Sequence, residues 1–172
     1  MPDEILLDPA DFVTVGTVGP KGRRVFYIQG GQGSQIVTLT IEKQQAQALS
    51  DAIEEMLDAL KERYPDLPDV NVNLSRWDMS LHDPIEPLFR VSQMGLGYDE
   101  ERDLIQLVMQ ELVVSENEEE EEREPILEPQ PQVVRMWATR EQVRALSDYA
   151  QTVVKKGRAD PKTNGYMIYY WT

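Results

Sequence analysis

The chain has no cysteine among its 172 residues. This absence excludes disulfides, thiolate zinc sites and cysteine nucleophiles, and it is typical of a reducing compartment. No apolar run approaches the roughly 20 residues that a membrane-spanning helix needs. The N-terminus, Met1-Pro2-Asp3-Glu4, is acidic where a secretory signal is basic, so we expect a cytoplasmic protein with no membrane partner.

Positive charge is also scarce, because 17 Lys and Arg residues stand against 31 Asp and Glu, a net charge of −14. Long-range repulsion opposes non-specific binding to nucleic acid and anionic lipid, so we expect no nucleic-acid partner. Much of the excess lies in residues 116–124, E-N-E-E-E-E-E-R-E. Such a block is typically a solvated loop. The alternative is a docking segment for a basic partner, centred on Glu119, Glu120 and Glu121.

Two segments of the chain match each other without a gap. Residues 35–51 read QIVTLTIEKQQAQALSD and residues 132–148 read QVVRMWATREQVRALSD, an offset of 97 with seven of seventeen positions identical. In each copy a β-rich run gives way to helical spacing. A match of this length predicts two copies of one structural unit.

The hairpin before each match repeats more faintly, at an offset of 79. Residues 12–18 and 91–97 have the pattern of first strands, and residues 23–29 and 102–108 that of second strands. The two offsets differ by 18, which places an 18-residue insertion containing the glutamate run between the second and third strands of the second copy.

We therefore predict an α+β fold in one domain, residues 1–172. Strand-strand-strand-helix repeats over residues 12–63 and 88–157 form a pseudo-symmetric unit with antiparallel sheets. Residues 64–87 are an irregular connector, residues 116–129 an acidic flexible loop and residues 158–172 a C-terminal tail.

Both predicted helices carry an apolar stripe on one face. The stripe residues are Leu49, Ile53, Met56, Leu57 and Leu60 in the first helix, and Val143, Leu146, Ala150, Val153 and Val154 in the second. Thr139 with Gln142 predicts a capping box, and Gly157 predicts the end of the second helix.

A series of short elements spans about Leu7 to Tyr166. They are Asp8-Pro9, Phe12, Gly16-Thr17-Val18-Gly19, Gly22-Arg23, Phe26, Gln29, Glu42-Lys43-Gln44-Gln45, Phe89-Arg90-Val91 and Asn164-Gly165-Tyr166. In this order they resemble an uncharacterised, mostly actinobacterial family of conserved repeat proteins, a domain of unknown function. The resemblance implies no established activity. It implies a cysteine-rich, zinc-knuckle-like segment near the C-terminus, but residues 157–164 hold no cysteine, so we expect neither metal nor cofactor.

His82 is the one histidine, in the run Asp78-Met79-Ser80-Leu81-His82-Asp83. Beside carboxylates it could act as a general base or as half of a metal site. The alternative, a residue of a proline-rich connector, is the more common role. No known catalytic motif is present, and we assign no catalytic residue.

Lys21, Arg23 and Arg24 gather positive charge in the glycine-rich hairpin of residues 16–24. They could bind a small anion or a nucleotide, or they could keep a tight turn soluble. Because strand side chains alternate, Arg24 shares the core-facing parity of Phe26, and Arg23 faces outward. We expect Arg24 to pair with a structural carboxylate and Arg23 with Lys21 to form the anion site.

The C-terminal residues Tyr169, Tyr170 and Trp171 are either an edge strand or an exposed patch that docks a partner or a second copy. Together these features predict a non-enzymatic binding or regulatory protein with a protein partner, bound through the groove between the halves, the acidic loop or the tail. The alternative is a small-anion or nucleotide-binding protein, possibly an enzyme, built on the basic hairpin. A homo-oligomer is compatible with both.

Overall fold

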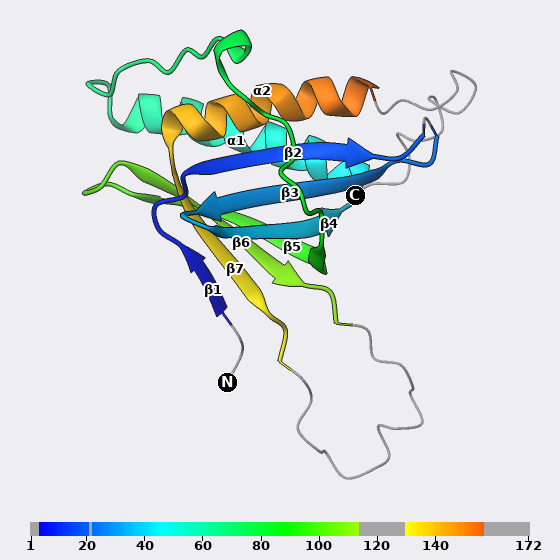
Figure 1. The fold of residues 1–172 in the computed structure, drawn as a ribbon. Coiled ribbons are helices and arrows are strands. Elements are labelled where there is room, and N and C mark those ends of the chain that lie inside the picture. The colour runs from blue at the N-terminus through cyan, green and yellow to red at the C-terminus, as the bar shows by residue number, and fades with distance from the viewer. Residues whose placement is uncertain (1–3, 21, 114–129, 157–172) are drawn as a thin grey trace.

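A seven-stranded sheet carries two long helices on one face in the computed structural model, which describes residues 4–20, 22–113 and 130–156 (Figure 1). The strands are β1 (Glu4–Leu7), β2 (Phe12–Val18), β3 (Val25–Gln32), β4 (Gln35–Ile41), β5 (Pro87–Asp99), β6 (Leu104–Glu111) and β7 (Val133–Thr139). The helices are α1 (Lys43–Arg63) and α2 (Arg140–Lys156), with a short 3-10 turn η1 (Leu74–Arg76) between β4 and β5. The predicted α+β class is confirmed.

The sheet is mixed, so the prediction of antiparallel sheets is wrong. Its order is β1-β7-β6-β5-β4-β3-β2. The runs β2-β3-β4 and β5-β6-β7 are antiparallel. β4 pairs with β5 in parallel, and β1 pairs with β7 in parallel. The chain passes from β4 to β5 through α1 and the connector, and a crossover of this length allows parallel pairing where a tight turn does not.

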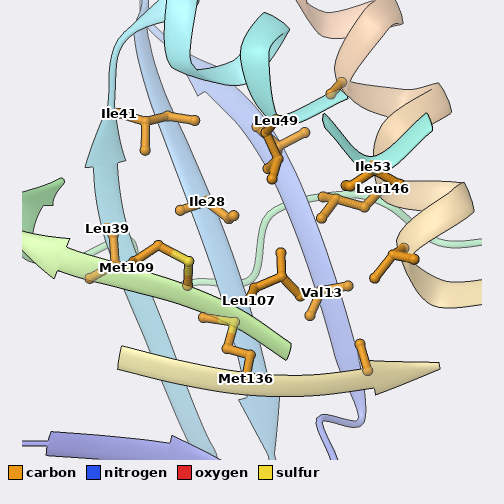
Figure 2. Close-up of a cluster of buried hydrophobic side chains, with 14 of the residues drawn as sticks. Val13, Ile28, Leu39, Ile41, Leu49, Ile53, Leu107, Met109, Met136 and Leu146 are labelled. Atoms are coloured by element: carbon orange, nitrogen blue, oxygen red, sulfur yellow. The ribbon is translucent and has the colours of Figure 1, made fainter. Parts of the chain in front are cut away.

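The core lies between the helices and the sheet face that they cover. Figure 2 shows Ile28, Leu39 and Met109 from the strands beside Leu49 of α1 and Leu146 of α2, and all of these side chains are buried. The predicted helix stripes face this core, with Met56 and Val154 partly buried at its margin.

Both helices begin with a capping box directly after a strand. The Thr139 amide donates to Gln142 Oε1 at 2.7 Å, and the Gln142 amide donates to Thr139 Oγ1 at 3.0 Å, which confirms the predicted box. Glu42 and Gln45 form the same box at the start of α1, where the sequence analysis did not expect one.

The connector crosses the sheet face opposite the core. Its residues Met79 to His82 run over β2 and β3, and Gln29, which is fully buried there, holds them. Gln29 Nε2 donates to the His82 carbonyl at 2.9 Å, and the His82 amide donates to Gln29 Oε1 at 2.8 Å. Leu81 lies so close to Gly16 that a Cβ there would be 2.7 Å from Leu81 Cγ.

Residues 116–129 and 158–172, the predicted acidic loop and tail, lie outside the described residues, and so does Gly157. In the part of the chain that the structure describes, no helix is both long enough and apolar enough to cross a membrane.

Candidate docking groove

Within the basic hairpin, Arg24 is bound to the end of a helix. Arg24 Nη1 donates to the Lys156 carbonyl at 2.9 Å, so its partner is the unpaired end of α2 and not the predicted carboxylate. The predicted alternation holds, because Phe26 is buried whereas Val25 is 40% exposed. Arg23 is exposed, and Lys21 lies outside the described residues, as do Glu119 to Glu121 and Tyr169 to Trp171.

His82 is used in packing. Its ring stacks on Phe12, with centroids 3.9 Å apart and an angle of 13° between the planes. Its backbone is bound by Gln29, as described above. Among the described residues, no three His, Cys, Asp or Glu side chains are grouped so that they could hold a metal ion.

A polar cluster at the β5–β6 turn contains three ionisable groups with shifted pKa values, Tyr98, Asp103 and Arg140. Asp103 accepts from Arg140 through both carboxylate oxygens, at 2.8 and 3.0 Å, and from the Tyr98 hydroxyl at 2.8 Å. The Arg140 guanidinium holds the pKa of Asp103 below its usual value. Burial, together with the hydrogen bond to Asp103, raises the pKa of Tyr98 to about 12. Arg140 also donates to the Pro68 carbonyl at 2.9 Å, so this cluster fastens the turn to the start of α2 and to the connector.

A hollow lies between α1 and β5, and we call it the α1–β5 groove. Its volume is about 600 Å³. It is lined by Gln45, Ala48, Leu49, Ala52, Glu55 and Met56 of α1 and by Ser92, Met94, Gly95 and Leu96 of β5. The polar atoms of Gln45 are already used, because its amide nitrogen donates to the Val91 carbonyl at 3.0 Å and its oxygen caps α1. The groove surface is therefore mainly apolar.

At one position beside the groove, α1 carries a small side chain where α2 carries a large one. Ser50 of α1 and Ser147 of α2 meet at the helix crossing, 97 residues apart in the chain. At the same separation Ala52 corresponds to Tyr149, which packs against the core. Ala48 corresponds to Ala145, which is fully buried, whereas Ala48 is exposed. α2 lies closely on β2, and α1 meets β5 at few positions.

A smaller hollow of about 190 Å³ lies where the end of α1 meets the start of α2. Three of its charged residues are engaged with neighbours: Lys61 pairs with Asp69 at 3.0 Å, and Arg140 binds Asp103 and the connector. It offers less apolar surface than the α1–β5 groove, and we assign it no ligand.

Of the side chains singled out in the sequence, Gln45 and the stripe residues Leu49 and Met56 line the α1–β5 groove, and none of them was a candidate site residue. Alanines give no signal of a binding site on their own. The signal lies one position beyond the gap-free match, where Ala52 stands against Tyr149 at the same offset of 97.

The comparisons with known proteins agree with the expected resemblance. A family model described as a protein of unknown function (DUF3090) matches residues 6–163. No curated protein matches the chain. No solved structure matches it either.

Proposed function

Since the chain belongs to this family of unknown function, which assigns no activity, we propose from its geometry that it is a non-enzymatic binding protein. The α1–β5 groove docks a protein segment that carries aromatic side chains. The observation that carries this proposal is an apolar hollow of about 600 Å³ beside α1, at a place where α2 is closed on its strand. A cytoplasmic location and a protein partner, both expected from the sequence, belong to the proposal.

The proposal includes the internal duplication. In support of it, Ser50 Oγ donates to the Ser147 carbonyl at 3.0 Å and Ser147 Oγ donates to the Ser50 carbonyl at 3.1 Å, a reciprocal contact. Gln45 reaches the Val91 carbonyl, and Gln142 reaches the Ala10 carbonyl at 3.0 Å. Each helix thus begins by binding a segment from the other half of the chain, which supports a groove between the two halves.

The groove has the chemistry of a site for ring side chains. Its volume lies in the range of roughly 300–1,000 Å³ that is typical of ligand pockets. Met56, Met94 and Leu96 offer adaptable apolar walls, and methionine sulfur makes favourable contacts with rings. Glu55 at the exposed rim offers an acceptor for a phenol or indole donor.

The expected affinity is modest. Burying one aromatic side chain removes about 150–250 Å² from water, worth roughly 4–6 kcal/mol at about 25 cal/mol/Å². Lost rigid-body freedom on association offsets about 4–15 kcal/mol, so a single ring gives weak binding. Two or three rings are needed for a micromolar complex.

The test is a selection of phage-displayed random peptides on the full chain, followed by binding to two variants. Ala52→Tyr fills the groove with the side chain that α2 carries at Tyr149, and Asp51→Tyr places the same ring on the exposed side of α1 as a control. We expect clones rich in Trp, Tyr and Phe that lose at least tenfold in affinity on Ala52→Tyr and not on Asp51→Tyr. Clones that bind Ala52→Tyr as well as wild type would show that the groove is not the site.

The alternative of a small-anion or nucleotide site on the hairpin stays a prediction. Arg24 is engaged with the end of α2, which leaves Arg23 and Lys21 as the candidate pair. Replacing both by Ala should leave stability nearly unchanged, since exposed charges contribute under about 1 kcal/mol. A thermal-shift screen against nucleotides and sugar phosphates tests this alternative, because a ligand that binds the folded state raises its melting temperature.

A further inference from the structure

The chain leaves α2 at the end of the molecule where the groove begins. α1 and α2 run in opposite directions on the sheet (Figure 1), so the end of α2 lies beside the start of α1. The Lys156 carbonyl is bound by Arg24. Phe26, two residues after Arg24, pairs with Ile41, which stands two residues before the start of α1. Gln45, in the first turn of α1, is the first groove residue.

The sequence that follows has the composition that the groove calls for. Residues 166–171 read YMIYYW, six apolar or aromatic side chains without a charge. Nine residues, 157–165, separate them from α2. Nine extended residues span up to roughly 30 Å. The groove follows α1 from Gln45 to Met56, about 17 Å at 1.5 Å per residue. The segment is long enough to reach every part of the groove.

We propose that residues 166–171 occupy the α1–β5 groove of their own chain. This inference rests on the proposed function and names the regulation of the same site. A ring from this segment takes the place above Ala52 that Tyr149 fills beside α2. A partner segment must then displace it, so the groove is autoinhibited and binds strongly only those partners that outcompete an intramolecular ligand.

Effective concentration makes this competition severe. A segment tethered by a short linker is present at about millimolar concentration next to its site. Even a weak intrachain contact therefore excludes an external peptide of similar affinity, until the concentration of that peptide is comparable to the effective concentration of the tethered segment. The absence of cysteine in this chain allows the contact to be tested by cross-linking with no background thiol.

The first experiment introduces two cysteines into the full chain. Thr172→Cys lies next to Trp171 and keeps all the aromatic residues, and Ala52→Cys places its partner in the groove. The control pairs Thr172→Cys with Asp51→Cys on the exposed side of the same helical turn. A disulfide needs Cα atoms within about 7 Å. We expect the intramolecular Ala52–Thr172 disulfide to form at least ten times faster than the control. Equal rates, or mainly disulfide-linked dimers, would overturn the inference.

The second experiment separates this inference from the proposed function. A fluorescein-labelled synthetic peptide of residues 164–172 is titrated into wild type, into the variant Tyr169→Ser/Tyr170→Ser/Trp171→Ser, and into that variant with Ala52→Tyr added. We expect at least tenfold tighter binding to the triple-serine variant than to wild type, and its loss on adding Ala52→Tyr.

Equal binding to wild type and to the triple-serine variant would overturn the intramolecular occupancy while leaving the groove as a docking site. Binding to neither would also overturn the inference. The peptide selection on wild type then decides whether the proposed function falls with it.

Discussion

Replacing Gln29 by Met should release the connector from the outer face of the sheet. Gln29 is fully buried in β3 and forms three hydrogen bonds: to Thr38 Oγ1 at 2.9 Å, to the His82 carbonyl at 2.9 Å and from the His82 amide at 2.8 Å. Methionine has a similar size and no amide. The substitution therefore leaves the His82 amide and carbonyl without partners and removes the donor to Thr38 Oγ1, while changing the packing little.

The magnitude of the destabilisation follows from the two backbone groups of His82 that lose their partners. A buried polar group that loses its partner costs about 1–3 kcal/mol. His82 is partly exposed, so water reaches it, and we expect about 2–4 kcal/mol in total. For a domain of this size each 1 kcal/mol shifts the melting temperature by roughly 2–4 °C, which gives a decrease of roughly 4–16 °C.

The assay is thermal and urea denaturation followed by circular dichroism, with hydrogen exchange at the His82 amide as a local measurement. Gln93→Met is the matched control, because Gln93 is an exposed glutamine of β5 and should stay within about 0.5 kcal/mol of wild type. A Gln29→Met variant that is as stable as Gln93→Met, with the His82 amide still protected, would refute the reasoning.

Three further outcomes are expected. Gly16→Ala should lower the melting temperature, because the added Cβ would lie 2.7 Å from Leu81 Cγ. Gly95→Ala should leave the melting temperature unchanged or raise it slightly, because a Cβ there has nothing within 4 Å. The reverse order of the two variants in thermal denaturation would contradict this reasoning. Burial raises the pKa of Asp148 in the folded state, so the contribution of this carboxyl to stability is complete below pH 3.8 and is lost as the pH rises through the raised pKa. In guanidinium denaturation, Asp148→Asn should therefore be more stable than wild type at pH 7 and equal to it at pH 3. The pKa of Tyr98 is raised from 10.0 to about 12, so the contribution of this hydroxyl to stability is complete below pH 10 and is lost as the pH rises through 12. Between these pH values, wild type should lose stability more steeply than Tyr98→Phe. Equal slopes for the two proteins would argue against the raised pKa.

Local features of the fold were predictable from the sequence because short-range patterns determine them. The apolar stripes predicted both helices, which occupy Lys43–Arg63 and Arg140–Lys156. Strand β2 has the predicted bounds. β1, with four residues, is too short to give a periodic signal, and the sequence analysis did not predict it.

Features that depend on distant segments were not predictable. Gln29 alternates with apolar neighbours as an exposed polar residue would, and the segment that buries it lies 53 residues further along the chain. The parallel pairing of β4 with β5 depends on where the connector returns to the sheet. The sequence predicted binding sites at the charged and aromatic runs, whereas the groove lies over the small side chains of Ala48 and Ala52.

The packing of α2 on β2 has a consequence for how the chain folds during synthesis. The helix that covers β2 is α2, and its last residues are made more than a hundred positions after β2. At about 5–20 residues per second, the apolar side of β2 stays uncovered for several seconds or longer while the rest of the chain emerges. The N-terminal part of the chain alone is therefore an incomplete folding unit that exposes apolar surface during synthesis. The native structure forms late and cooperatively, because its contacts join residues that are far apart in the sequence.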